Sequence, residues 1–187
     1  PSRRLPATVI HQGTITIEDR QAAPGTPPLE IRDVCLSTNN DPLSVISFDG
    51  AGFVEPIGLV RLSGRASRGG PIALTIDAPE LKVGPEFVQR LAGYAPEAAV
   101  HLRQLSALVK VHAEIAIDPS STSPPHFVIR GELSEGEFAH ARLPWPLHKV
   151  SGSFSARDGV APEVKLHGQA GKTQIEATLR NVKLASG

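Results

Sequence analysis

The stretch Val109-Lys-Val-His-Ala-Glu-Ile-Ala-Ile117 decides the fold, because apolar and polar residues alternate along it with a period of two. Its odd-numbered positions are aliphatic, and its even-numbered positions include lysine, histidine and glutamate. A strand with one apolar and one polar face produces this period, whereas a helix repeats every 3.6 residues. Such alternation is typical of antiparallel sheets, since parallel strands covered on both faces read as continuous apolar runs.

The same alternation recurs before and after this stretch, at 14–18, 72–78, 160–170 and 174–180. Glycine-bearing sequences that are typical of tight turns separate the runs: Asp49-Gly50, Arg68-Gly69-Gly70, Arg157-Asp158-Gly159 and Ala170-Gly171-Lys172. Proline-rich segments at 22–28 and 119–125 are predicted to be surface loops, because proline cannot donate a hydrogen bond into a ladder. The chain is therefore predicted to be mainly β, with the hairpin Val164–Ala170/Thr173–Leu179 as its clearest unit.

One region interrupts the strand pattern and predicts helix. The segment Gly84–Gly93 has proline at the first helical position and glycine after the last one. A second short helix is predicted from Pro96 to about Arg103. These one or two helices, around residues 85–104, are expected to form either a lid or plug at an open edge of the sheet, or a crossover on its surface.

A weak internal repeat links the two ends of the chain. Gly13–Asp19 leads through a proline loop to Pro28–Leu36, and Gly136–Arg142 leads in the same way to Pro146–Phe154. In each case the order is glycine, a short strand, a proline loop, the dipeptide Pro-Leu and a new strand. The repeat is one of pattern rather than of identical residues.

The length of 187 residues and the mass of 19.8 kDa suit a single β-rich domain or a fragment of a longer protein. The repeat divides residues 1–187 into halves at 8–80 and 106–184, which the helical segment 81–105 joins. We expect an excerpt of a longer chain, because the sequence lacks an initiator methionine and ends directly after a strand-like run.

The composition argues against several classes of function. Lys+Arg and Asp+Glu both number 19, so the formal charge is zero, whereas nucleic-acid binders and polybasic membrane modules are basic. Trp and Tyr occur once each, too few for the aromatic platforms of sugar or single-strand sites. No window of about 18 apolar residues predicts a membrane span. No nucleic-acid partner is expected.

The sequence contains no signature of catalysis, metal binding or cofactor binding. None of the seven histidines lies in a His-Glu-x-x-His spacing, and no Gly-x-Ser-x-Gly elbow or phosphate-binding loop is present. Cys35 is the only cysteine, which excludes an internal disulfide and a cysteine-based zinc site. It is expected to be a buried or half-buried structural thiol. The protein is predicted not to be an enzyme.

Two pairs of histidines are candidates for a metal or catalytic site. His112 and His167 fall on the polar sides of their strands and are expected to be solvated surface residues. His140 and His148 flank Pro144-Trp145-Pro146, where we favour a turn with a packed tryptophan over a binding loop. Asp19, Asp33, Asp49 and Asp77 are expected at strand ends beside turns, where aspartate commonly caps or turns the backbone.

Several segments resemble the repeat of bacterial AsmA-like proteins. They are Gly13-Thr-Ile-Thr-Ile-Glu-Asp19, Pro28-Leu-Glu-Ile-Arg-Asp-Val-Cys-Leu36, Val150-Ser-Gly-Ser-Phe-Ser-Ala-Arg-Asp-Gly159, Val164-Lys-Leu-His-Gly168 and Ile175-Glu-Ala-Thr-Leu-Arg-Asn181. The helix-bearing stretch Leu81–Leu105, followed by a long strand, is also similar. The resemblance covers roughly residues 8–184, and its motifs are degenerate.

The resemblance implies a β-groove, in which a long antiparallel sheet curls into a taco-like trough with an apolar concave face that holds lipid acyl chains. Members of the family are usually anchored in the inner membrane and extend into the periplasm, where they act in lipid traffic and envelope homeostasis. It therefore implies a phospholipid ligand, envelope protein partners and a membrane link only through an anchor outside this chain. Because the chain is short, it is expected to hold only part of a groove.

The candidate groove lining is aliphatic rather than aromatic. It consists of Val109, Val111, Ile115, Ile117, Phe127, Ile129, Leu133, Val164, Leu166, Ile175 and Leu179. Burial of a lipid methylene is worth about 0.8 kcal/mol, so such a surface can hold an acyl chain without specific chemistry.

The alternative is a closed β-sandwich or jelly roll, in which the same residues form a sealed core. The protein would then be a structural or protein-interaction domain of a cell-envelope protein. The two alternatives differ in whether Val111, Ile115 and Leu166 remain accessible or are buried between two sheets.

Overall fold

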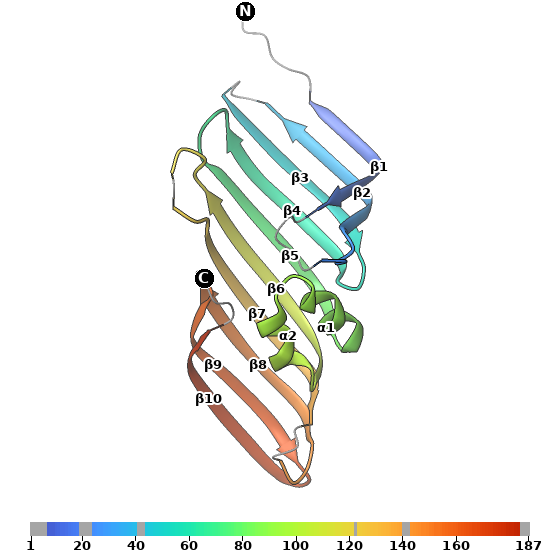
Figure 1. Ribbon diagram of the computed structural model, residues 1–187, viewed down its shortest axis with the longest axis vertical. Coiled ribbons are helices and arrows are strands. Elements are labelled where there is room, and N and C mark those ends of the chain that lie inside the picture. Colours follow the sequence, from blue (N-terminus) through green and yellow to red (C-terminus); the bar gives the residue numbers. More distant parts are fainter. Residues whose placement is uncertain (1–6, 19–23, 41–43, 122, 140–142, 184–187) are drawn as a thin grey trace, which may run out of the picture.

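The computed structural model describes residues 7–18, 24–40, 44–121, 123–139 and 143–183, which form ten strands and two short helices (Figure 1). The strands are β1 (Thr8–Ile17), β2 (Leu29–Asn39), β3 (Val45–Val54), β4 (Gly58–Ser67), β5 (Ile72–Val83), β6 (Leu105–Ile117), β7 (His126–Phe138), β8 (Leu147–Arg157), β9 (Val160–Ala170) and β10 (Thr173–Lys183). The helices are α1 (Pro85–Ala92) and α2 (Pro96–Leu102), close to the predicted bounds.

All ten strands belong to one antiparallel sheet whose spatial order follows the sequence from β1 to β10. The sheet does not close, and among the described residues its outer strands β1 and β10 pair with β2 and β9 alone. The predicted curled antiparallel sheet is therefore confirmed, and the closed sandwich is wrong. A sandwich needs strands that leave one sheet and join a second, whereas here each strand pairs with its sequence neighbours.

The cross-strand register divides the side chains between two faces. Residues directly opposite each other in antiparallel strands project to the same side. The face that carries Val111, paired with Ala78 and Gly131, is called the apolar face. The face that carries His112, paired with Asp77 and Arg130, is called the polar face.

Both helices lie between β5 and β6 and pack on the apolar face at one end of these strands (Figure 1). The buried cluster beneath them consists of Leu81, Val83, Ala107 and Val109, and Phe87 and Leu102 pack against it. The helices are short because glycine and proline interrupt them: Pro85 and Pro96 begin them, and Gly93 follows α1. They cover one end of the apolar face and leave the remainder of the sheet without a second layer.

The tip of the β1–β2 hairpin reaches α1. The Tyr94 hydroxyl donates to the carbonyl of Pro27 over 2.8 Å, and the Thr26 hydroxyl donates to the carbonyl of Gly93 over 3.3 Å. The guanidinium of Arg90 donates to the carbonyl of Pro28. Because α1 lies on the apolar face, these contacts show that this end of the sheet curls toward the apolar side (Figure 1).

The short turns agree with prediction except at Asp49-Gly50. Asp158 and Gly159 both have positive φ, 49° and 81°, as a two-residue hairpin turn requires. Asp49-Gly50 lies inside β3 instead of in a turn. Asp33 and Asp77 also lie inside strands, β2 and β5, and Asp19 lies outside the described residues. Gly50 is required there by close packing, because a Cβ would lie 2.6 Å from the carbonyl oxygen of Cys35 on β2.

The two repeated phrases of the sequence fold into two hairpins with the same irregularity, β1–β2 and β7–β8. In each strand of both hairpins one non-glycine residue has positive φ: Gln12 (55°), Asp33 (52°), Glu135 (52°) and Lys149 (51°). The residues that follow them pair across the hairpin, Gly13 with Val34 and Gly136 with Val150, and both valines are 4% exposed. The register shifts at each of these positions, so both hairpins carry paired bulges.

Candidate functional site

The apolar face is the candidate site. All of the residues predicted to line a groove lie on it: Val109, Val111, Ile115, Ile117, Phe127, Ile129, Leu133, Val164, Leu166, Ile175 and Leu179. They lie on four strands, β6, β7, β9 and β10, and β8 links β7 to β9 in register. Ile115 pairs with Phe127, Val109 with Leu133, and Leu179 with Val164. A period of two in each strand, continued in register from strand to strand, places these residues together.

Among residues 7–181 that are paired in register, none on the apolar face has an ionisable side chain. Every lysine, arginine, aspartate and glutamate in this range with a cross-strand partner lies on the polar face, as in the pairs Arg61–Asp77 and Lys110–Glu132. The apolar face is aliphatic, aromatic or glycine apart from threonines near the two ends of the sheet, such as Thr8, Thr38 and Thr173. The described residues therefore form a sheet with charge on one side only.

Most of this face is accessible. Val109 is buried, at 6% exposure, because the helices cover it. Val111, Ile115 and Leu166 are half-buried, and Leu179 on the outer strand is 47% exposed. No strand in the part of the chain that the structure describes forms a second sheet above them. The partial burial of these residues comes from their neighbours on the same face.

The first half of the chain contributes lining residues that the sequence reasoning missed. On the same face lie Ile31, Leu36, Ile46, Phe48, Leu62, Leu74 and Ile76, and from the second half Phe154. Two of them, Leu74 and Ile76, belong to the alternating stretch 72–78 that predicted a strand, although they were not included in the predicted lining. In β3 and β4 glycine replaces aliphatic residues at Gly50, Gly52 and Gly64, which weakens the period-two pattern.

Large side chains on the apolar face lie opposite glycines. Phe48 pairs with Gly64, and Phe154 pairs with Gly131. A Cβ on Gly64 would lie 2.5 Å from Phe48 Cζ, and a Cβ on Gly131 would lie 2.2 Å from Phe154 Cε1, so each ring covers its glycine. Rings that lie over glycines in this way fill the face without projecting from it.

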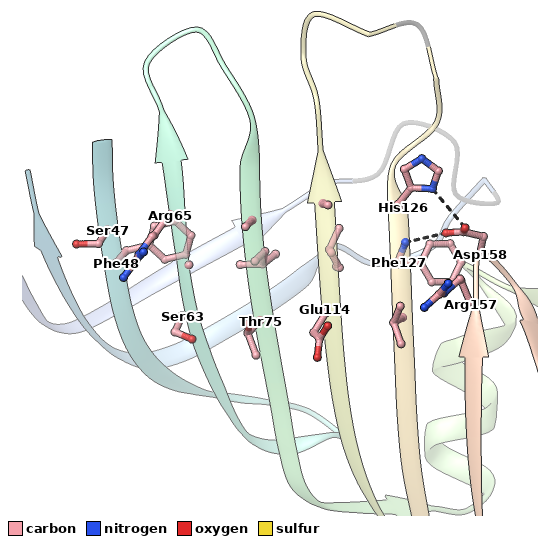
Figure 2. Close-up of a pocket in the computed structure, with 16 residues that line it drawn as sticks. Ser47, Phe48, Ser63, Arg65, Thr75, Glu114, His126, Phe127, Arg157 and Asp158 are labelled. Carbon is pink, nitrogen blue, oxygen red and sulfur yellow. Dashed lines mark hydrogen bonds and ion pairs between the residues drawn. The ribbon is translucent and has the colours of Figure 1, made fainter. Parts of the chain in front are cut away.

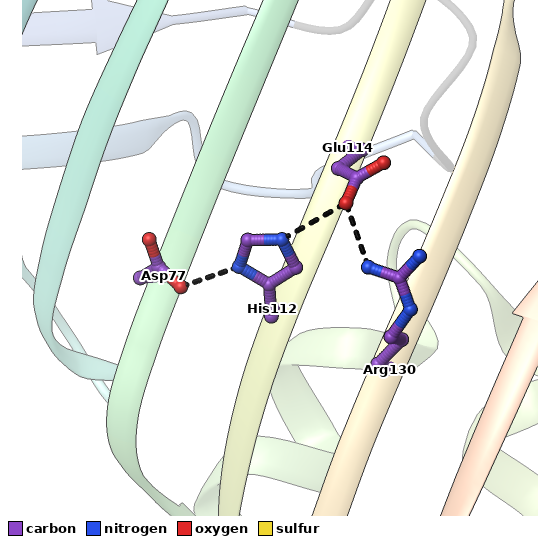
Figure 3. A network of polar contacts seen from close by, with 4 residues as sticks. All are labelled: Asp77, His112, Glu114 and Arg130. Atoms are coloured by element: carbon purple, nitrogen blue, oxygen red, sulfur yellow. Dashed lines mark hydrogen bonds and ion pairs between the residues drawn. The ribbon is translucent and has the colours of Figure 1, made fainter.

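The polar face carries a charged network over β5, β6 and β7 (Figure 3). His112 Nδ1 lies 2.7 Å from Asp77 Oδ1, and its Nε2 lies 3.2 Å from Glu114 Oε1. Arg130 Nη1 donates to the same Glu114 oxygen over 2.6 Å. The bond to Asp77, then that to Glu114, raises the pKa of His112, whereas Arg130 and then His112 lower the pKa of Glu114. His112 is thus an ion-paired residue rather than a simply solvated one.

A hollow of about 810 Å³ crosses β3 to β8 (Figure 2). It is lined by Ser63 and Arg65, by Ala73 and Thr75, and by Glu114 and Ala116, which are adjacent polar-face positions on three neighbouring strands. Ile72 and Ile76, the apolar-face neighbours of Leu74, do not line it, so the hollow opens on the polar face.

At one end of this hollow Asp158 accepts a hydrogen bond from the backbone N–H of Phe127 over 2.9 Å and lies 3.3 Å from His126 Nδ1. The backbone bond, then His126, lowers the pKa of Asp158. This arrangement fixes the β8–β9 turn against β7. The Asp158 carboxylate stabilises the turn through these two contacts, and its surroundings do not indicate a nucleophile or a general base.

Two of the expectations about single residues are wrong. Cys35 is exposed, because Val34 and Leu36 occupy the apolar face and the residue between them projects to the polar side. Trp145 is 67% exposed and is not packed in its turn. His140 lies outside the described residues, and His148 is an exposed residue 3.2 Å from Glu137.

The described ranges contain no group of three or more His, Cys, Asp or Glu residues that could hold a metal ion. Neither α1 nor α2 has the length and apolar character needed to span a bilayer. Comparison of the chain with protein-family models, with curated proteins and with solved structures gives no match. The site is therefore interpreted from its own geometry.

Proposed function

We propose that this chain is a non-enzymatic lipid-binding segment that holds acyl chains on the apolar face of its sheet. The observation that carries the proposal is an open apolar face that extends over ten strands without an ionisable side chain in register. Soluble proteins rarely leave a contiguous apolar surface of this extent without an occupant. The scarcity of polar groups on this face favours an occupant that is apolar where it contacts the sheet.

An acyl chain matches the chemistry of this surface. Each methylene that leaves water contributes about 0.8 kcal/mol, and no hydrogen-bond partner is required. Part of this gain offsets the entropy lost on association. Because the contacts are repeated and individually weak, a chain can move along the face by exchanging one set of methyl contacts for the next. The mechanism is passive transfer along an aliphatic surface.

The helices divide the apolar face into a covered and an open part. Phe87 and Leu102 pack over the cluster that contains Val83 and Val109. The rows that carry Leu74 with Ile115 and Ile72 with Ile117 lie farther along β5 and β6, away from this cluster. We place the acyl chain over these rows, because no helix or strand of the described residues covers them.

Membership of the AsmA-like family belongs to the same proposal and rests on the sequence resemblance alone. With it we propose a periplasmic location, attachment to the inner membrane through a segment outside this chain, and phospholipid as the ligand. Partners in the cell envelope are part of this proposal too.

Acyl-chain binding is tested with delipidated protein, palmitate and dioleoylphosphatidylethanolamine, by native mass spectrometry and by displacement of a fluorescent fatty acid. Ile115→Glu places a charge in the centre of the open apolar rows and is expected to weaken binding at least about tenfold, since burial of a carboxylate against hydrocarbon is unfavourable. The matched control is Ala116→Glu, which adds the same charge to the next, exposed residue on the polar face.

Binding by the parent chain and by Ala116→Glu, together with loss in Ile115→Glu, supports the proposal. Absence of binding by the folded parent chain contradicts it. Equal binding by both variants also contradicts it, because the ligand would then not occupy the apolar face. Circular dichroism and urea unfolding establish that both variants are folded.

A further inference from the structure

The outer strand β1 differs from every other strand in its charge. Its sequence, Thr-Val-Ile-His-Gln-Gly-Thr-Ile-Thr-Ile, contains no lysine, arginine, aspartate, glutamate or proline. Each of the other nine strands that the structure describes contains at least one of the four charged residue types. Among the described residues, β1 and β10 are the two strands that have a neighbouring strand on one edge alone. The strand without charged residues is therefore one of these two outer strands.

This arrangement is the reverse of what protects a free edge. Exposed edge strands are normally protected by charged residues, by proline or by bulges that prevent another strand from pairing. The other outer strand, β10, has such protection, because it carries the charged residues Glu176 and Arg180. β1 has the composition of a strand that is paired on both sides, with Val9 at 54% and Ile17 at 46% exposure in the single chain.

The bulge of β1 does not prevent pairing on its outer edge, as the second hairpin demonstrates. β7 carries the same bulge, with Glu135 and Gly136 in the places of Gln12 and Gly13. The edge of β7 that corresponds to the free edge of β1 is occupied by β6 over almost its whole length, from Leu105–Phe138 to Ala116–His126. The same edge geometry therefore accepts an antiparallel strand within this molecule.

From these observations we propose that β1 is a dimer interface, at which the β1 strands of two copies of this chain pair antiparallel about a two-fold axis. Only the β1 edge lacks protection, so the occupant that fits without opposing charges is a second β1. A two-fold pairing is self-complementary and closes after two subunits. With the axis perpendicular to the sheet, the two apolar faces lie on the same side and form one continuous surface.

A full-length pairing of β1 with itself keeps like faces together. It places Ile10 opposite Ile15 of the second copy and Thr8 opposite Ile17, all of which belong to the apolar face. On the polar face it places Val9 opposite Thr16. Aliphatic and threonine pairs of this kind stabilise neighbouring strands. The bulge at Gln12 of one copy lies beside the bulge of the other copy at the centre of the paired strands. Apolar-face residues therefore lie opposite apolar-face residues on both sides of the bulges.

The test is sedimentation velocity of the purified chain between about 1 and about 100 µM, a range in which a micromolar dimer dissociates on dilution. We expect a species of twice the 19.8 kDa chain mass at the upper end. Ile15→Lys is expected to give monomer throughout, because its charge would face the apolar side of the paired edge. Leu179→Lys is the matched control, since Leu179 is on the same face of the other outer strand at similar exposure, 47% against 37%.

A second measurement addresses the case in which Ile15→Lys fails to fold. Amide hydrogen exchange of the parent chain is expected to be slower in β1 at high than at low concentration, with no such change in β10. A chain that stays monomeric at every concentration contradicts the dimer. Growth of larger assemblies, or equal loss of association in both variants, would also overturn it. Lipid binding is scored separately by the Ile115→Glu test, so the two proposals fail independently.

Discussion

Gly64 lies within β4 opposite Phe48, and its environment explains why glycine is frequent in the strands of this protein. A Cβ at this position would lie 2.4 Å from the carbonyl oxygen of Ala73 and 2.5 Å from the Phe48 ring. Glycine usually weakens a strand because it has no side chain to pack. Here the ring of the opposite residue supplies that packing, and the glycine provides the space for it.

Replacement of this glycine tests the packing. Gly64→Ala is expected to destabilise the fold by about 1 to 3 kcal/mol, the usual cost of overpacking, because backbone or ring must move. Gly168→Ala is the control: its Cβ would meet nothing closer than Val150 Cγ2 at 3.5 Å, so a change within about 0.5 kcal/mol is expected. Urea unfolding measures both. Equal stabilities would show that the Phe48 ring and β5 adjust without cost.

His112 makes the stability of the folded chain depend on pH. The carboxylates of Asp77 and then Glu114 raise its pKa, so the folded chain holds the proton more tightly than the unfolded one. The resulting stabilisation is complete below the ordinary histidine pKa of about 6.5 and is lost as the pH rises through the higher value of the folded state. Relative to His112→Gln, the Tm of the parent chain is expected to fall as the pH rises above about 6.5.

NMR titration of the imidazole provides the direct measurement. The pKa of His112 is expected to fall when Asp77→Asn removes the partner at 2.7 Å. An unchanged pKa in that variant would show that the network does not hold the proton. Because the side chain is 36% exposed, the effect on stability is expected to be small.

At the scale of elements, sequence pattern predicted strands and helices well wherever one face of the element is buried. The runs at 109–117 and 174–180 are strands, and both helices begin at the expected prolines. Asp49-Gly50 was misassigned because a glycine required by close packing and a glycine required by a turn look alike in sequence. The paired bulges of β1–β2 and β7–β8 are reflected in the sequence, because the two repeated segments begin at the bulge residues Gly13 and Gly136.

The two helices are held on the sheet by a small number of apolar contacts. Phe87→Ala removes a half-buried ring that packs on the cluster of Leu81, Val83 and Val109, and is expected to cost about 2 kcal/mol. Gln89→Ala, at an exposed position of the same helix, is expected to change stability by less than about 0.5 kcal/mol. Urea unfolding of the two variants compares them. Equal stabilities would mean that the helices are not anchored through Phe87.

At the scale of the whole molecule, the absence of a second sheet among the described residues separates this chain from an ordinary β domain. In a sandwich the apolar faces of two sheets cover each other. Here the described residues place α1, α2 and the segment Thr26–Pro28 of the β1–β2 connection on the apolar side of one ten-stranded sheet, and no second sheet. An apolar face without a covering layer and an outer strand without charged residues are both features that indicate binding of another molecule.

The sequence by itself determined the strand period, the position of the helices and which residues of β6, β7, β9 and β10 share the apolar face, because alternation and helix boundaries are local properties. Only the tertiary structure decided that the sheet stays open, that β3 and β4 extend the apolar face, and that His112 is ion-paired while Cys35 is exposed. These features depend on which strand lies beside which, and in what register. The same alternating sequence satisfies a sealed core and an open face equally well, and cross-strand pairing alone distinguishes them.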